Sequence, residues 1–254
     1  MILGYNLMAT WGPRPATPEA CATHAVRMFA ALGKLHPALA RWQFEQERPP
    51  VAADSIDPDT LARLFAHGQN RESSDGEPLL SLGYDITAWN GLSDSLYVVT
   101  HITAGGYSTA WHFANVIDFR LEQAAPDNAS LLTVDVLRSA VMAVVEAWDA
   151  TWCDVSPFSL HRLLPRDPNR RAPRYHGGWL TYIAPRFASL IRPPASAITE
   201  HPPGGGVLMI ATEERFDVDE PKHVRVARDI HTALAPLNAL PWPPDSDVAP
   251  ETVA

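Results

Sequence analysis

The stretch LLSLGYDITAWNGLSDSLYVVTHITAGGYSTAWHFANVIDFRLE, which occupies residues 79–122, decides the fold of this chain. It contains three apolar runs rich in β-branched and aromatic residues, and these runs are separated by Asn90-Gly91 and by Gly105-Gly106. Runs of this kind, bounded by Gly and Asn clusters, are typical of consecutive antiparallel strands. The stretch therefore predicts a three-stranded meander.

Alternation along the meander predicts two unlike faces. In the first run every second position is apolar, at Leu80, Leu82, Tyr84, Ile86 and Ala88. The third run is dominated by Phe113, Val116, Ile117 and Phe119. The other face carries polar residues that include Asp85, Thr87, His101 and Asp118. Because successive side chains of a strand point to opposite sides, we expect one face to pack on a core and the other to be hydrated or to dock a partner.

Proline and capping residues mark the helices on either side of the meander. Thr17-Pro18 and Asp57-Pro58 each join an N-cap residue to a proline in the first helical turn, and Glu220-Pro221 starts a last helix. Helices are thus expected at residues 18–32, at 58–67, from residue 221 onward and, from its apolar spacing, between Val134 and Trp148. His36-Pro37 opens a shorter helical piece that we expect to extend through Trp42.

The order of elements predicts the fold class. Further strands are expected at residues 2–11, 152–156, 177–183 and 207–212. Strands and helices that are segregated in this way favour an α+β fold with a mainly antiparallel β-sheet, a central three-stranded meander and about four flanking α-helices. We expect a single domain over residues 1–240, followed by a proline-rich acidic tail over 241–254 that is disordered.

Composition restricts the classes of partner. The chain has 254 residues, of which 46% are hydrophobic and 19% charged, and its formal net charge is -9. This negative charge disfavours nucleic acid and allows a basic partner. The opening MILGYNLMATWG lacks the features of a secretion signal, and no run approaches the roughly 18 apolar residues that a membrane span requires. We therefore expect a soluble cytoplasmic protein with no membrane association.

The motifs of common reaction centres are missing. None of the ten histidines belongs to an HExxH or HxH motif, no serine has a GxSxG context, and the two cysteines do not form a spaced cluster. We expect no metal and no cofactor. One enzymatic alternative stays open, in which Cys153 is a nucleophile paired with His161 in a small-molecule enzyme. The commoner situation is a buried structural thiol beside Trp152.

Acidic residues gather before the last helix, where Glu213, Glu214, Asp217 and Asp219 precede Glu220. Such residues stabilise the N-terminus of a helix without any further duty. They could equally form a recognition patch that steers a basic partner. The sequence supports both interpretations.

Aromatic residues suggest anchors for a protein partner. The chain holds eight tryptophans, and Trp89 lies beside Asn90-Gly91 at a predicted strand end. Tryptophan is enriched among the residues that dominate protein interfaces. The residues we select as candidates for binding a partner are Asp85, Trp89, Asn90, Asp94, Glu213, Glu214, Asp217 and Asp219.

Several stretches together resemble one bacterial family. The opening MATWGPRPATPEACATHAVRMFAALGKLHPALARW is followed by YDITAWNG, ANVIDFRL, GGWLTYIAP, GVLMIATEERFD and HVRVARDIHTALAPL. This succession is similar to the immunity protein 52 family of polymorphic-toxin and type VI secretion immunity proteins, over roughly residues 2–240. The positions that carry the resemblance are Trp11, Gly12, Arg14, Trp89, Asn90, Gly91, Asn115, Gly178, Trp179, Leu180, Thr181 and Tyr182.

The resemblance implies a function that needs no catalysis. It implies an antitoxin that binds and blocks a cognate toxin encoded by a neighbouring gene, typically a toxin with a restriction-endonuclease-like nuclease domain. The family brings no catalytic residues and no cofactor. Most of the matching positions are expected to serve the fold. A structural role in a secretion apparatus is a further, weaker alternative.

Overall fold

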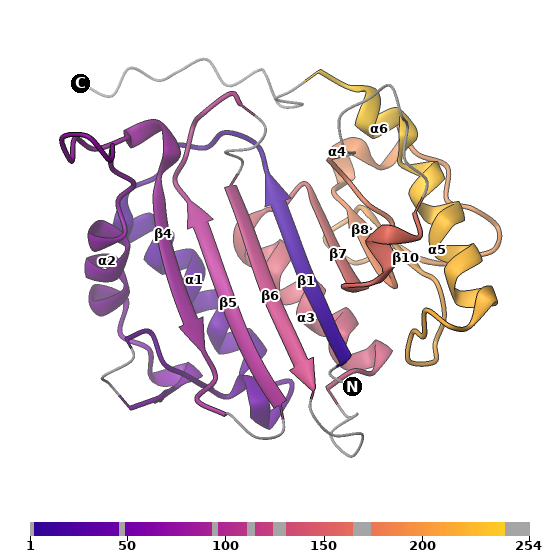
Figure 1. Ribbon diagram of the computed structural model, residues 1–254, viewed down its shortest axis with the longest axis horizontal. Coiled ribbons are helices and arrows are strands. Elements are labelled where there is room, and N and C mark those ends of the chain that lie inside the picture. The colour runs from indigo at the N-terminus through magenta and orange to yellow at the C-terminus, as the bar shows by residue number, and fades with distance from the viewer. Residues whose placement is uncertain are drawn as a thin grey trace.

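One antiparallel sheet of eight strands organises the described part of the chain. The computed structural model describes residues 3–45, 49–92, 96–110, 115–123, 131–164 and 174–241. The strand order is β4-β5-β6-β1-β7-β8-β10-β9 (Figure 1). The strands are β1 (Leu3–Trp11), β4 (Tyr84–Trp89), β5 (Leu96–Ala104), β6 (Asn115–Gln123), β7 (Trp152–Pro157), β8 (Leu180–Ile183), β9 (Ile198–Glu200) and β10 (Val207–Ile210). The α+β class predicted from the sequence is confirmed.

The predicted meander is present as β4, β5 and β6, but it forms one end of the sheet instead of its middle. The central position belongs to β1, which pairs with β6 on one side and with β7 on the other. The first meander strand is also shorter than its alternation suggests, because Leu80–Leu82 form a 3-10 turn. Gly83 follows with φ +70, and a Cβ there would lie 2.3 Å from the Ala104 carbonyl oxygen, so only glycine fits.

Six α-helices lie within the described residues, two more than expected. They are α1 (Pro18–Leu32), α2 (Pro58–His67), α3 (Val134–Trp148), α4 (Pro185–Ala188), α5 (Pro221–Ala233) and α6 (Ala235–Ala239). The capping signals are confirmed, since the Thr17 hydroxyl accepts from the Ala20 amide at 3.3 Å and the Asp57 carboxylate accepts from the Asp59 and Thr60 amides. The additional helices α4 and α6 are single turns, which are too short for a periodic sequence signal.

Two short segments differ from expectation. The helical piece predicted from His36 to Trp42 is only a 3-10 turn, Pro37–Leu39, after which β2 (Arg41–Trp42) pairs with β3 (Val51–Ala52) in a separate sheet. The proline-rich connector before β10 contributes β9, which extends the main sheet by one strand. Proline is tolerated next to edge strands because a donor missing there breaks no ladder.

The core lies between one face of the sheet and the helices α1, α2 and α3. On this side Leu7 of β1 and Phe119 of β6 line one apolar pocket together with Leu32 of α1 and Leu137 of α3. The Trp11 and Trp148 rings stack there with centroids 5.1 Å apart. The apolar residues whose spacing predicted α3 are all buried: Val134, Leu137, Val141, Val144, Val145 and Trp148.

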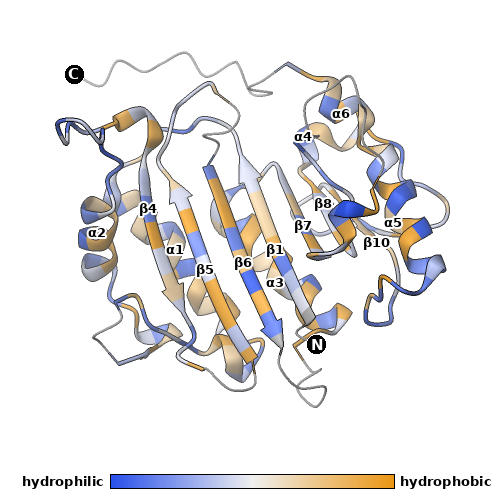
Figure 2. Cartoon of the chain, in the orientation of Figure 1, coloured by the Kyte–Doolittle hydropathy of each residue, from blue (hydrophilic) through white to orange (hydrophobic). Residues whose placement is uncertain are grey.

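The other face of the sheet is covered only in part. Over β7, the segment 175–178 lies against the sheet, where the Trp152 indole donates to the His176 carbonyl oxygen at 3.1 Å. Helix α5 packs on this segment, because a Cβ on Gly177 would meet the His231 backbone nitrogen at 2.3 Å. Figure 1 shows no helix in front of β4, β5, β6 and β1 among the segments it describes. Figure 2 shows polar and apolar residues alternating along β5 and β6.

Candidate protein-binding surfaces

The uncovered side of β4, β5, β6 and β1 forms a continuous surface that we call the open face. Its residues follow from the strand register, since directly paired residues share a face. They are Asp85, Thr87, Trp89, Tyr97, Val99, His101, Thr103, Val116, Asp118, Arg120, Glu122, Asn6, Met8 and Thr10. This is the polar face that the sequence predicted from Asp85, Thr87, His101 and Asp118. Arg120 and Glu122 continue the same face of β6 at every second position after Asp118, a pattern that the sequence contains but that was predicted only from Asp118.

Asp85 and His101 form the centre of a hydrogen-bonded cluster on the open face. The Thr103 hydroxyl donates to Asp85 Oδ1 at 2.5 Å, and His101 Nε2 lies 3.4 Å from the same oxygen. His101 Nδ1 lies 3.2 Å from the Thr87 hydroxyl. Burial acts to raise the pKa of Asp85, but hydrogen bonds from His101, Thr103 and Asn70 outweigh it and lower this pKa. The cluster therefore holds a fixed carboxylate.

Asp118 lies next to this cluster and has an unused acceptor. Its Oδ2 lies 3.6 Å from Arg120 Nε, whereas its Oδ1 is buried and accepts no hydrogen bond within the described residues. Asn6, on the neighbouring strand, also has a buried Oδ1 without a partner there, and this residue is only 9% exposed. Buried polar atoms in folded proteins nearly always have a partner, so these two acceptors call for an explanation.

Aromatic side chains flank the open face on two sides. At the β4 edge, Trp89 and Tyr97 make an edge-on contact with ring centroids 6.3 Å apart. At the β1 side, Phe158 is 41% exposed and its ring lies over Gly4, where a Cβ would be only 2.2 Å from the ring. Large aromatic side chains at the margin of a polar surface are suited to anchoring a protein partner.

Asn90 has a structural task in this position. Its side-chain amide donates to the carbonyl oxygens of Ala38 and Leu96, and its Oδ1 accepts from the amides of Leu92 and Val98. With 3% exposure and all four hydrogen bonds used inside the chain, this side chain offers nothing to a partner. Asp94, the neighbouring candidate, lies outside the described residues.

The four acidic candidates of the second half lie together in the loop between β10 and α5. Glu213, Glu214, Asp217 and Asp219 are all exposed. Part of the loop serves the fold, because Asp217 Oδ1 accepts from the Asp219 amide at 2.9 Å. The loop does not adjoin Asp85, because it contacts β1 on the helix side of the sheet, where the Tyr5 hydroxyl donates to the Phe216 carbonyl oxygen at 2.6 Å. Asp85 lies on the open face of β4, three strand positions from β1. The candidates thus divide into two surfaces.

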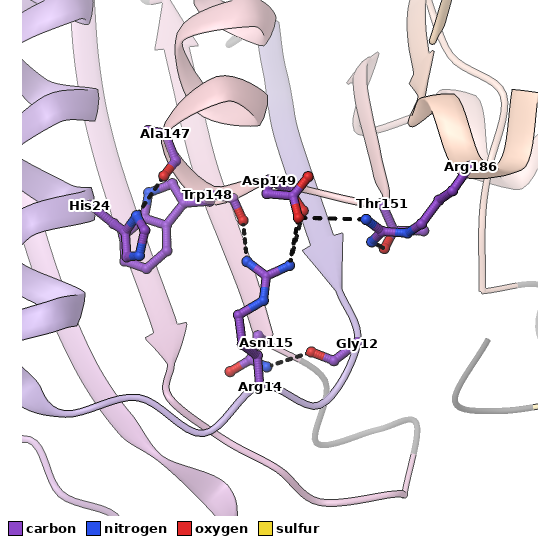
Figure 3. A network of polar contacts seen from close by, with 9 residues as sticks. All are labelled: Gly12, Arg14, His24, Asn115, Ala147, Trp148, Asp149, Thr151 and Arg186. Carbon is purple, nitrogen blue, oxygen red and sulfur yellow. Dashed lines mark hydrogen bonds and ion pairs between the residues drawn. The ribbon is translucent and has the colours of Figure 1, made fainter. Parts of the chain in front are cut away.

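The WGPR segment that follows β1 has a clear structural role (Figure 3). Arg14 donates to the Trp148 carbonyl oxygen at 2.7 Å and to Asp149 Oδ2 at 3.1 Å, so it caps the C-terminus of α3. Asp149 has φ +46, the left-handed conformation that ends a helix, and Arg186 Nη1 lies 3.5 Å from its carboxylate. Asn115 donates to the Gly12 carbonyl oxygen at 2.8 Å.

The GGWLTY segment is structural as well. The Gly178 amide donates to the Thr181 hydroxyl at 2.9 Å, and the Trp179 indole donates to the Thr212 carbonyl oxygen at 2.9 Å. Gly178 lies directly over Asp154 of β7, because a Cβ there would be 2.6 Å from Asp154 Oδ2. Burial raises the pKa of Asp154 to about 8, although a hydrogen bond from Ser156 opposes the shift.

The structure does not bring Cys153 and His161 together. Cys153 pairs with Ala9 and points to the helix side of the sheet, where complete burial raises its pKa. His161 belongs to the other side, because its ring lies 5.0 Å from His176, which in turn contacts Trp152. A thiol that is hard to ionise and separated from the histidine by the sheet is not an activated nucleophile.

The described residues form neither a metal-binding cluster nor a membrane-spanning helix. In the ranges given above, no group of three or more His, Cys, Asp or Glu side chains is arranged to hold a metal ion. Nor does any helix in those ranges combine the length and the apolar character that crossing a membrane requires.

The chain matches a family model, and its fold is similar to that of solved structures. The family model described as immunity protein 52 matches residues 4–240. No curated protein is matched. Among solved structures, the Pseudomonas aeruginosa T6SS protein PA0821 is similar with a TM-score of 0.50 and 12% identity, over 91% of this chain and 77% of that chain. At this identity the likeness extends to the fold alone.

Proposed function

The chain belongs to the immunity protein 52 family, and on this premise we propose that it neutralises a cognate toxin by tight protein association and performs no bond-making itself. The observation that carries the proposal is the family match, which extends over residues 4–240 and thus includes both candidate surfaces. The open face supports it, because a polar sheet face flanked by aromatic residues is suited to covering another protein.

The proposed partner is a toxin encoded by a neighbouring gene, with a restriction-endonuclease-like nuclease domain. The net charge of -9 supports this choice, because nucleases bind a polyanion and therefore present basic surfaces. We propose the cytoplasm as the place of action, where a nuclease would meet its substrate. A type VI secretion system is the proposed delivery route, since PA0821 is a T6SS protein of similar fold.

Co-expression tests the proposal. The toxin gene and this gene are placed under separate inducible promoters, and survival is measured with the toxin alone, with both proteins, and with both after a premature stop codon in the immunity gene. We expect survival only when the intact immunity protein is made. We also expect the two proteins to co-elute as a complex in gel filtration. Loss of viability in every culture, together with the absence of a complex, would refute the proposal.

A further inference from the structure

Resting on the proposed function, we propose that the toxin docks on the open face and presents arginine or lysine side chains to Asp118 and Asp85. The surface is the defined set of residues on β4, β5, β6 and β1, and its occupant is a protein surface rich in cationic hydrogen-bond donors. The acidic loop before α5 is assigned a different task, that of accelerating encounter from a distance. Four observations support this division.

The first observation is that the segments packed on this side of the sheet end at β7. On the same side of the sheet, Asp154 and Trp152 of β7 have no exposed surface, because segment 175–178 and α5 lie over them. Their direct partners on β1, Met8 and Thr10, are only partly buried. The described part of the chain thus covers this side of the sheet up to β7 and leaves the next four strands uncovered.

The second observation is the pair of unused acceptors. Asp118 Oδ1 and Asn6 Oδ1 are buried and unpartnered among the described residues, and both lie around Met8 in the register. Each atom can accept a hydrogen bond and neither can donate one if Asp118 is ionised. Since neither oxygen reaches the surface in the free protein, a partner completes them only when these side chains turn toward it, and it must then bring N–H donors. Arginine and lysine side chains carry such donors together with the positive charge that Asp118 requires.

The third observation is the charge of the surface. Asp85, Asp118 and Glu122 give it three carboxylates, whereas Arg120 is its single permanent cation among the described residues. His101 adds a charge only when protonated, and its hydrogen bond with Asp85 raises its pKa. Since Asp85 is held by Thr103 and His101, its carboxylate is pre-oriented and little entropy is lost when a cation binds it.

The fourth observation is the arrangement of aromatic and acidic groups. The register places Trp89, Tyr97 and the Phe158 ring over Gly4 at one end of the open face, where Tyr97 and Gly4 are the two direct partners of Glu122. Asp118 and Asp85 follow toward the other end of the strands. Binding energy in protein interfaces is concentrated in such aromatic anchors and in hydrogen-bonded charges close to them. The acidic loop has exposed carboxylates only, and exposed charges change the rate of association more than its strength.

Charge also distinguishes among the proteins or segments that could occupy the open face. A second copy of this chain carries the same net charge of -9, and the residues after Leu240 include Asp245, Asp247 and Glu251 without a single Lys or Arg. Both would meet the carboxylates of the open face with like charge. A basic protein surface meets them with opposite charge.

The experiment measures binding of the purified, catalytically inactivated toxin by surface plasmon resonance, with wild type first. Asp118→Lys is expected to raise Kd at least about 30-fold, mainly through faster dissociation. Asp85→Asn is also expected to raise Kd. The matched control is the triple variant Glu213→Gln, Glu214→Gln, Asp217→Asn, which should slow association several-fold and leave the dissociation rate unchanged. Far-UV circular dichroism and a melting curve establish that each variant is folded.

Carboxyl footprinting of the wild-type complex provides a test that needs no substitution. Carbodiimide labelling, read by mass spectrometry, should be reduced by the toxin at Asp85, Asp118 and Glu122 and unchanged at Glu213 and Glu214. If wild type binds but the open-face variants bind equally well, or if protection falls on the acidic loop, the inference is overturned and the proposed function stands. If wild type itself does not bind the toxin, the proposed function fails.

Discussion

At the scale of the residue, Asp154 shows how an ionisable group is accommodated inside this fold. It lies on the covered side of β7 beneath Gly178, with the Ser156 hydroxyl as its hydrogen-bond partner. Its Oδ1 has no partner within the described residues. A buried carboxyl without a countercharge is favoured in its neutral form, which is the physical reason for its raised pKa.

This raised pKa predicts a dependence of stability on pH. The folded-state pKa of about 8 exceeds the ordinary value of 3.8, so the stabilising contribution of protonated Asp154 is complete below pH 3.8 and is lost as pH rises to about 8. Asp154→Asn stays neutral at every pH. We therefore expect the free energy of unfolding of the variant, relative to wild type, to increase between pH 5 and pH 8, measured in urea.

The control for this prediction is Ser156→Ala. It keeps the Asp154 carboxyl and removes the hydroxyl that opposes the pKa shift, so its stability should fall with pH at least as steeply as in wild type. Parallel pH profiles for wild type and Asp154→Asn would contradict the prediction. The comparison between variants cancels the contributions of the other carboxylates, several of which have the opposite sign.

At the scale of the element, helix α3 depends on a single arginine from another part of the chain. Arg14 lies in the loop after β1, yet its guanidinium reaches the carbonyl oxygens of Trp148 and Asp149 and the Asp149 carboxylate. The last carbonyls of a helix have no partners within the helix, so a donor from outside stabilises its end. The connection fixes α3 to the centre of the sheet.

Replacing Arg14 should therefore destabilise the whole fold moderately. Arg14→Lys keeps the positive charge but lacks the planar fork that serves several acceptors at once, and we expect it to cost about 1–2 kcal/mol of unfolding free energy. Arg41→Lys is the matched control, because Arg41 is exposed and makes one bond to the Pro50 carbonyl oxygen. It should cost less than about 0.5 kcal/mol. Equal unfolding midpoints in urea for the two variants would argue against this role of Arg14.

At the scale of the whole molecule, one sheet connects the described elements from β4 to β9. Near residue 240, the Arg174 guanidinium ties the chain back to the segment before β8, because it donates to the carbonyl oxygens of Asn238 and Leu240. This continuity supports the proposal that residues 1–240 are one domain. The predicted tail, residues 241–254, lies outside the described residues except for Pro241, and its composition, rich in proline and acid, supports the proposal that it is not part of this domain.

Removal of residues 241–254 tests that proposal. The truncated protein retains the hydrogen bonds from Arg174 to the Asn238 and Leu240 carbonyl oxygens, so we expect its Tm to change by less than about 2 °C. Its unfolding should be a single transition that coincides when followed by far-UV circular dichroism and by tryptophan fluorescence. A loss of several degrees, or two separated transitions, would show that the division at residue 240 is wrong.

The sequence by itself determined the four longer helices and the presence of the three meander strands. Thr17-Pro18, Asp57-Pro58 and Glu220-Pro221 mark helix starts through bonds between neighbouring residues, so no distant part of the chain is needed to recognise them. The polar face of Asp85 and Asp118 was equally predictable, because alternation within a strand fixes which side chains share a side.

Tertiary structure alone decided where these elements lie and what covers them. Pairing of β1 with β6 and β7 joins residues more than a hundred positions apart, and no local pattern encodes which strands meet. This pairing moves the meander to the end of the sheet and separates β4, which carries Asp85, from β10, the strand before the acidic loop, by six strand positions. Likewise, Asp118 and Asp154 lie at similar alternating polar positions of their strands. Segment 175–178 packs over Asp154 and buries it, whereas Asp118 stays partly exposed.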